Sequence, residues 1–177
     1  LMSKFGAEFL PKKKENFPLK LISTEMPICI RYKAGVSAQL KSAAILAGLN
    51  SFGTTEIIEE KKSRDHTENM LIKNFQSIKI KEGKKRIIKV FGKKHLGPIN
   101  IYIPGDTSSA AFFTALTLLN KNSSLTITNV GLNPTRIGFY ELLKKHGANI
   151  KFYKKRKKNN EVTGNILIKS RKLKKPI

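Results

Sequence analysis

Two kinds of helical pattern occur along the chain, and each occurs twice. Residues 43–49 and 110–119 are apolar on nearly every side, which predicts helices that are buried over most of their surface. A second, amphipathic pattern predicts one helix that begins near Asp65 and another that begins near Pro134. Asp65 and Glu68 have the spacing of a capping box, which marks the start of the first amphipathic helix.

Short apolar stretches predict the strands that connect these helices. A strand is expected before each apolar helix, near residues 28–32 and 99–103, and another after it, near 55–58 and 125–129. Each amphipathic helix is followed by two strands joined by a basic turn, at 77–80 with 86–91 and at 150–153 with 165–169. The predicted order in each copy is therefore β-α-β-α-β-β, which places the chain in the α/β class.

The two copies are related by an internal repeat of about seventy residues. Residues 27–30, Pro-Ile-Cys-Ile, correspond to residues 98–101, Pro-Ile-Asn-Ile. Residues 1–9 resemble residues 142–150, where Gly147 is expected to end the second amphipathic helix. A repeat of this length consists of whole supersecondary units.

The repeat also indicates what the ends of the chain correspond to. Leu1 matches a position close to the last turn of a helix, and Pro176-Ile177 match the start of a further strand. We therefore expect an internal piece of a longer protein. We also expect part of the exposed surface to pack against units outside this piece.

The charge balance changes this picture little. Lys and Arg number 35 against 12 acidic residues, so the net charge of +23 favours nucleic acid, an anionic membrane or anionic small molecules as partners. The high content of Lys, Ile and Asn together is also typical of AT-rich genomes, which is an alternative explanation. Much of the charge lies in runs that we expect at solvated turn tips: 12–14, 84–86, 93–94 and 154–158.

Length and residue content set further bounds. The 177 residues, 40% of them hydrophobic, suffice for one domain or two small ones with a buried core. Cys29 is the single cysteine, so no internal disulfide forms, and no zinc-type Cys/His spacing occurs. We find no apolar run long enough for a membrane span and no secretion signal, so a cytoplasmic location is expected.

The first candidate site is the start of each apolar helix, at residues 37–39 (Ser-Ala-Gln) and 106–109 (Asp-Thr-Ser-Ser). A helix N-terminus presents unpaired N–H groups and partial positive charge, which suit a phosphate. The alternative is that Ser37 and Asp106 are ordinary N-caps, each stabilising its helix by about 1 kcal/mol. From the pattern alone, capping is favoured. If one site holds an anion, it is the first, because the Asp106 carboxylate repels a phosphate.

The second candidate site is the start of the first amphipathic helix. Ser63 and Arg64 open it, and the planar fork of an arginine suits a phosphate or a carboxylate. The alternative is a solvated helix start in which Arg64 pairs with Asp65 or Glu68. No nucleophile lies near His66, and the chain has no P-loop, no dinucleotide-binding glycine motif and no cluster of metal ligands.

Four segments resemble, in order and separation, the EPSP synthase (3-phosphoshikimate 1-carboxyvinyltransferase) family, in particular its bacterial class II branch. They are residues 37–43 (SAQLKSA), 63–68 (SRDHTE), 104–112 (PGDTSSAAF) and 130–138 (VGLNPTRIG). The resemblance covers essentially the whole chain. It implies the enolpyruvyl transferase fold, an inside-out α/β barrel with two lobes of repeated β-α-β-α-β-β units.

The resemblance also implies how the lobes divide the chain and where the substrates bind. The buried helices would direct their N-termini toward a cleft between the lobes. Residues 1–104 would be the C-terminal part of the first lobe, with one partial and one nearly complete unit. Residues 105–177 would be the first unit of the second lobe.

The activity implied by the resemblance is transfer of the enolpyruvyl group of phosphoenolpyruvate to the 5-hydroxyl of shikimate 3-phosphate, with release of phosphate. This reaction leads to chorismate and the aromatic amino acids. The implied partners are these two small anionic substrates, without metal, organic cofactor, nucleic acid or membrane, and the full-length enzyme would be a monomer.

Residue by residue, the resemblance implies a substrate-binding set within this chain. Ser37 and the backbone of Ala38 would bind the phosphate of shikimate 3-phosphate, and Gln39 would contact both substrates. Ser63 or Arg64 would complete the phosphate site. Family members often carry serine where this chain has Ala38, so one hydroxyl contact would be lost here.

Other parts of the family pattern are structural or lie elsewhere. Asp106 and Arg136 are expected to cap a helix and form ion pairs. The catalytic residues of the family fall outside these 177 residues, so we expect none here and no activity from the chain alone. Two alternatives remain: the related transferase that uses UDP-N-acetylglucosamine, and a basic nucleic-acid-binding module, which would need aromatic residues interleaved with the basic ones.

Overall fold

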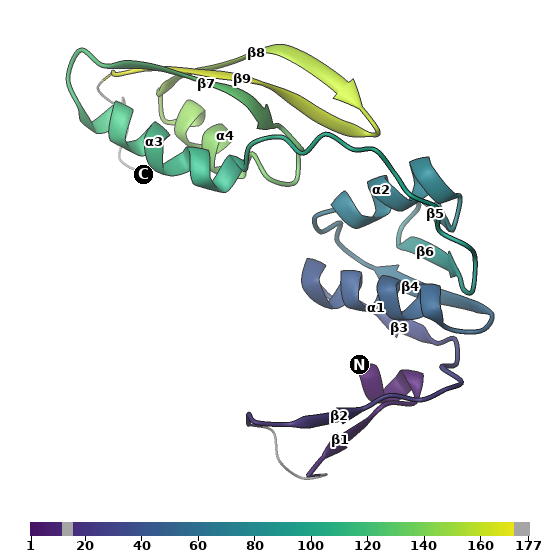
Figure 1. The fold of residues 1–177 in the computed structure, drawn as a ribbon. Helices are drawn as coiled ribbons and strands as arrows, with labels where there is room; N and C mark the ends of the chain where they lie inside the picture. The colour runs from purple at the N-terminus through teal and green to yellow at the C-terminus, as the bar shows by residue number, and fades with distance from the viewer. Residues whose placement is uncertain (12–15, 172–177) are drawn as a thin grey trace. The chain divides into compact units, whose positions relative to one another are not determined.

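The computed structural model describes residues 1–11 and 16–171, and the chain divides into two compact units, Leu1–Ile99 and Asn100–Ile177 (Figure 1). We refer to them as unit 1 and unit 2 and describe each by itself. None of the helices within the described residues combines the length and the apolar character needed to cross a membrane.

Unit 1 opens with a 3-10 turn, Met2–Phe5, and an antiparallel pair of short strands, β1 (Glu8–Leu10) and β2 (Lys20–Ile22). The main part of the unit is a four-stranded sheet with two helices, in the strand order β3-β4-β6-β5. Its elements are β3 (Arg31–Lys33), α1 (Ala38–Asn50), β4 (Thr54–Glu59), α2 (His66–Phe75), β5 (Ile78–Lys81) and β6 (Arg86–Phe91).

The order β-α-β-α-β-β predicted for the first copy is confirmed. Strands β3 and β4 run parallel, and the other neighbours are antiparallel. The strand residues that alternate toward the helices form the core together with inward residues of α1 and α2. Its fully packed members are Ala34, Ala44, Ile45, Ile57, Leu71, Ile78, Ile88 and Val90.

Unit 2 repeats this order with one difference. Its elements are α3 (Thr107–Leu119), β7 (Ser124–Gly131), α4 (Gly138–Lys145), β8 (Asn149–Lys158) and β9 (Glu161–Lys169), and its sheet has the order β7-β9-β8. The strand predicted at 99–103 is wrong, because that segment pairs with no strand. Only Gly105 makes an isolated parallel bridge, to Val130. Extended residues become a strand only when a neighbour accepts their hydrogen bonds.

The repeat is visible in the backbone hydrogen bonds at Gly6 and Gly147. Both glycines adopt the left-handed conformation, with φ of 100° and 93°. The amide of each glycine donates to the carbonyl three residues earlier, at 3.1 and 3.0 Å. The alanine that follows donates to the carbonyl five residues earlier, at 3.3 and 3.0 Å. Gly147 therefore ends its helix as predicted, and residues 1–9 adopt the same turn as residues 142–150.

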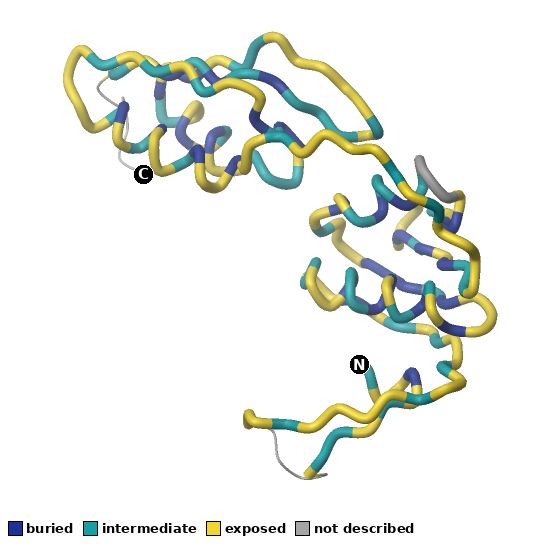
Figure 2. The backbone as a smooth tube through the Cα atoms, viewed as in Figure 1, coloured by how far each residue is buried: buried dark blue, intermediate teal, exposed yellow. Residues whose placement is uncertain are grey.

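The prediction that the apolar helices are buried on most sides is wrong for the described chain. Both helices bury only the stripe that faces their sheet, and α3 alternates between buried and exposed along its length (Figure 2). Phe112 and Leu119 of α3 are 80% and 84% exposed, and Leu46 of α1 is 56% exposed. A helix that packs on one sheet buries only the side that faces the sheet. Within the described residues, no second layer packs against the opposite side of either helix.

Three local predictions also need correction. Asp65 is the N-cap of α2, but its side chain makes no capping hydrogen bond. Helix α4 begins at Gly138, because Pro134 and the two residues after it form a turn. The basic run 154–158 lies in strand β8, and Asn159-Asn160 make the turn. The basic run 12–14 lies outside the described residues.

Candidate functional site

Both predicted anion-binding segments of unit 1 follow strands that run parallel in one sheet. Strand β3 leads into residues 37–39 at the start of α1, and β4 leads into Ser63 and Arg64 before α2. The last residue of β3, Lys33, is in register with Ile58 near the end of β4. Parallel strands end at the same edge of a sheet, and this is where ligands bind in open α/β sheets. The two segments therefore share one edge of unit 1.

The start of α1 presents unpaired donors. The Oγ of Ser37 accepts the amide of Leu40 at 3.3 Å, so this hydroxyl keeps its own proton for another acceptor. The amides of Ala38 and Gln39 donate to no acceptor among the described residues. Ser37 and Ala38 are half-buried, whereas Gln39 is exposed. This helix end can therefore bind an anion through a hydroxyl and backbone N–H groups, aided by the helix dipole.

The matching helix end in unit 2 is already occupied by a carboxylate. Asp106 accepts the amide of Ser109 at 2.8 Å and its hydroxyl at 3.1 Å. Arg136 forms an ion pair with Asp106 and donates to the Oγ of Ser108 at 2.8 Å. The backbone hydrogen bond from Ser109 is the main reason that the pKa of Asp106 lies below its usual value. This helix end is therefore already occupied by a carboxylate, whose charge is paired with that of Arg136.

Ser63 is turned toward the protein interior. Its amide and its hydroxyl both donate to Oε1 of Glu59, at 3.1 and 2.6 Å. The hydroxyl has only one proton, so while this bond is formed Ser63 can offer a ligand only lone pairs. Ser63 therefore holds the loop in place rather than supplying a donor.

Arg64 is an available cation of this loop. It is exposed, and its guanidinium pairs with no group among the described residues. The alternative, an ion pair with Asp65 or Glu68, does not form, because Asp65 pairs with Lys62 at 2.8 Å and Glu68 points into the interior. The arginine fork remains open to a ligand.

Behind both segments lies a group of buried charges that the sequence pattern did not indicate. We call it the charged quartet: Lys41, Glu59, Glu68 and Arg86. The Nζ of Lys41 lies 3.0 Å from Oε1 of Glu59 and 2.8 Å from Oε1 of Glu68. Nη1 of Arg86 lies 2.7 Å from Oε2 of Glu59 and 3.0 Å from Oε1 of Glu68. The sequence offered a signal for Lys41 alone, which shares the inward stripe of α1; a buried lysine requires carboxylate partners, but the pattern does not identify them.

The quartet pairs two basic with two acidic side chains, and its contacts favour the ionised forms of Glu59 and Arg86. Burial alone would raise the pKa of Glu59, but hydrogen bonds from Ser63, Arg86 and Lys41 outweigh it and lower the pKa below its usual value. Burial likewise opposes the charge of Arg86, and its carboxylate partners raise its pKa nevertheless. The pKa shifts of Glu59 and Arg86 therefore both favour the charged form at neutral pH.

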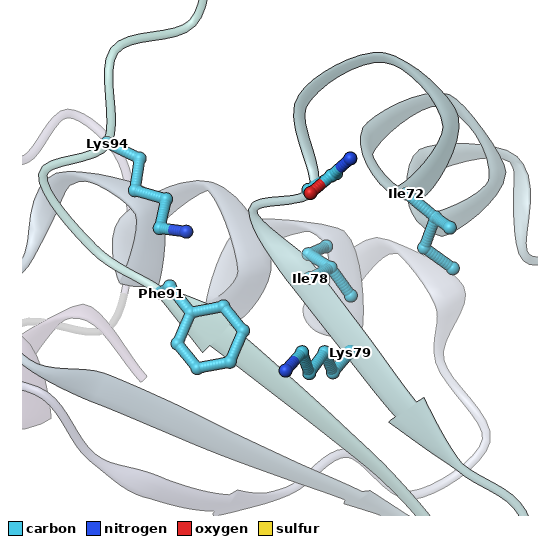
Figure 3. Close-up of a pocket in the computed structure, with 6 residues that line it drawn as sticks. Ile72, Ile78, Lys79, Phe91 and Lys94 are labelled. Atoms are coloured by element: carbon cyan, nitrogen blue, oxygen red, sulfur yellow. The ribbon is translucent and has the colours of Figure 1, made fainter.

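A hollow elsewhere in unit 1 includes none of the predicted site residues. It is lined by Ile72, Gln76, Ile78, Lys79, Phe91 and Lys94. Figure 3 shows the side chains of Lys79 and Lys94 near the ring of Phe91. Their ammonium groups lie 5.8 and 5.2 Å from the ring centre. No group of three or more metal-ligating side chains is found among the described residues.

Comparison with known proteins decides the family. A family model described as EPSP synthase (3-phosphoshikimate 1-carboxyvinyltransferase) matches residues 3–175. The chain belongs to the EPSP synthase family. Among curated relatives, 3-phosphoshikimate 1-carboxyvinyltransferase of Petrotoga mobilis is 43% identical over 175 residues, which are 98% of this chain and 40% of the relative. The enzyme of that name from Bartonella tribocorum is 41% identical over 172 residues, covering 96% and 39%.

Solved structures agree with this EPSP synthase assignment. EPSP synthase from Acinetobacter baumannii superposes with a TM-score of 0.78 at 35% identity, covering 97% of this chain and 39% of that one. The enolpyruvyl transferase NikO from Streptomyces tendae has a TM-score of 0.63 at 16% identity, covering 92% and 40%, and shows the fold alone. The predicted fold is confirmed, and the chain spans about 40% of the length of the relatives it matches.

Proposed function

We propose that this chain forms part of an enzyme that transfers the enolpyruvyl group of phosphoenolpyruvate to the 5-hydroxyl of shikimate 3-phosphate. The identity of 43% to a relative named for this reaction supports the proposal. C3 of phosphoenolpyruvate gains a proton while the 5-hydroxyl adds to C2 and gives up its own proton, and the tetrahedral adduct then loses phosphate from C2 and a proton from C3, which restores the double bond. Such a reaction requires that two polyanions be held together in fixed geometry.

In this proposal, the edge of unit 1 binds the phosphate of shikimate 3-phosphate. The Ser37 hydroxyl and the N–H groups of Ala38 and Gln39 supply hydrogen bonds, and Arg64 supplies the cation. The observation that carries the proposal is that these unpaired donors and an unpaired guanidinium follow neighbouring parallel strands. The exposed Gln39 side chain is placed to contact phosphoenolpyruvate as well.

Asp106 and Arg136 have structural roles in this proposal. Their ion pair and the cap formed by Asp106 close the start of α3. The Asp106 carboxylate already takes the donors of Ser109 and the charge of Arg136 that a second phosphate would need. The cytoplasmic location and the monomeric state of the full-length enzyme remain predictions.

Calorimetric titration of the 177-residue chain tests the proposal. We expect shikimate 3-phosphate to bind at least about tenfold more tightly than shikimate, because the phosphate makes the principal contacts. Arg64→Met should weaken shikimate 3-phosphate binding by about tenfold or more, since charge-assisted hydrogen bonds are lost. The matched control Arg156→Met removes the same charge from an exposed residue of β8 and should leave the affinity unchanged. Equal affinity for shikimate and its phosphate would refute the proposed site.

A further inference from the structure

The charged quartet joins four elements of unit 1. Lys41 comes from α1, Glu59 from the end of β4, Glu68 from α2 and Arg86 from the start of β6. Lys41, Glu59 and Glu68 are fully buried, and Arg86 is 6% exposed. Four ionisable side chains therefore lie together beside the apolar core of unit 1.

The quartet contacts both halves of the proposed phosphate site. The amide of Lys41 donates to the carbonyl of Ser37 at 3.1 Å, so Lys41 lies one turn beyond the N-cap of α1. Oε1 of Glu59 forms an ion pair with the Lys41 ammonium, at 3.0 Å, and accepts a hydrogen bond from the Ser63 hydroxyl, at 2.6 Å. A single carboxylate oxygen thus connects the first turns of α1 with the loop that carries Arg64.

We propose that the charged quartet is a positioning device that fixes the Ser63–Arg64 loop against the start of α1, so that both segments reach one phosphoryl group together. This inference rests on the proposed function. Glu59 is the central positioning residue because it holds both segments. None of the quartet side chains needs to touch the ligand.

Stability alone does not account for the quartet. Buried ion clusters usually stabilise a fold no better than apolar side chains of the same volume, because the charges must be removed from water. An apolar residue at position 59, however, would leave the amide and hydroxyl of Ser63 without their acceptor. The carboxylate therefore imposes a loop geometry that an apolar core does not.

A second connection between the helices makes the distinction testable. The hydroxyls of Ser42 in α1 and Thr67 in α2 are hydrogen-bonded at 2.9 Å. This bond ties α1 to α2 without involving Glu59 or Ser63. The helices therefore keep one tie when the quartet is altered.

The experiment follows backbone amide signals of the ¹⁵N-labelled 177-residue chain during titration with shikimate 3-phosphate. In the wild-type chain, the amides of Ala38 and Arg64 should respond together with one dissociation constant. In Lys41→Met, the shift of the Ala38 amide should require at least about tenfold more ligand. The shift of the Arg64 amide should then no longer fit the same dissociation constant as that of Ala38. Lys89→Met is the charge-matched control, because Lys89 pairs with Glu56 at the surface, and it should titrate as wild type.

Glu59→Gln separates positioning from simple charge. Removing a carboxylate near an anion site should strengthen phosphate binding if only Coulomb interactions matter, whereas loss of Lys41 should weaken it. Positioning predicts that both substitutions weaken binding by about tenfold and separate the responses of the two segments. A tighter complex for Glu59→Gln would overturn the inference.

Ser63→Ala keeps the inference testable if Lys41→Met does not fold. It removes one hydroxyl from a half-buried residue and leaves the other contacts of Glu59 in place. We expect the Arg64 response to separate from that of Ala38. If Ser63→Ala and every folded quartet variant titrate as wild type, the positioning role is wrong. If the wild-type amide of Ala38 does not respond at all, the proposed function itself fails.

Discussion

At the level of single residues, the site depends on where individual protons go. Ser63 donates its one hydroxyl hydrogen bond to Glu59, so Arg64 rather than Ser63 is the donor that we assign to the phosphate site. Ser37 receives the amide of Leu40 on its oxygen and keeps its proton. Serines at both predicted positions were identified from the sequence, but the inward role of Ser63 depends on Glu59. Its partners Lys41 and Arg86 are 18 and 27 residues away in the chain, and no local pattern reveals them.

The free energy of unfolding of unit 1 should fall at acid pH as the carboxylate of Glu59 is protonated. Its pKa is lower in the folded protein, so as the pH falls the unfolded chain takes up the proton first. The stabilisation is complete above the ordinary glutamate pKa of about 4.3 and is lost as the pH falls through the folded value. Glu59→Gln should flatten this acid limb in urea unfolding followed from pH 7 to pH 3. An unchanged slope would show that Glu59 is not held as a charged partner.

Gly92 marks a close backbone approach that leaves no room for a side chain. A Cβ atom at this position would lie 1.8 Å from the carbonyl oxygen of Ser51. Gly92→Ala should therefore destabilise unit 1 by about 3 kcal/mol, because the backbone has to move. Gly97→Ala, where a Cβ meets nothing within 4 Å, is the control and should change stability little. Similar unfolding midpoints for both variants would contradict this close approach.

At the level of elements, hydrophobic periodicity predicted most helices and strands, because a helix or a hairpin is largely encoded by its own residues. It failed where an element depends on a partner. Residues 99–103 read as a strand but pair with none, and the basic run 154–158 was expected in a turn but belongs to β8. Exposed charges are compatible with a strand whose face is in water. The exposed apolar side of α3 was also mispredicted for lack of a partner. The apolar pattern shows which side chains a helix is able to bury, but it does not show whether another element covers them.

The cap of α3 provides a test at this level. Asp106→Ala removes the acceptor for the Ser109 amide and should destabilise the start of α3 by about 1 kcal/mol. Asp106→Asn keeps an acceptor at the same position and should lose less. Amide hydrogen exchange in the first turns of α3 distinguishes the two variants. Equal exchange in both would mean that the ion pair with Arg136, and not the cap, holds this end.

For the chain as a whole, the repeat has produced two equivalent helix ends with different chemistry. The start of α1 is uncharged and has unpaired donors, whereas the start of α3 is filled by the Asp106 carboxylate. The family motifs located both ends and implied that only the first binds substrate. The family and the fold could be inferred from four sequence motifs. The charged quartet could not, because it is assembled from four separate elements.

The 177-residue chain should show no enolpyruvyl transfer by itself. It spans about 40% of the length of its relatives, and none of its residues is assigned a proton-transfer role in the reaction. A coupled assay for phosphate release with both substrates is expected to give the background rate. Turnover above background by this chain would contradict the expectation and would require catalytic residues among those described.

Titration of the ¹⁵N-labelled chain with shikimate 3-phosphate tests most directly which helix end receives the phosphate. Saturable shifts of the Ala38 and Gln39 amides are predicted, while the amides of Thr107 and Ser108 at the start of α3 stay in place. Shifts at Thr107 and Ser108 without any at Ala38 and Gln39, or no saturable shift at either helix, would contradict the assignment of the phosphate site to α1.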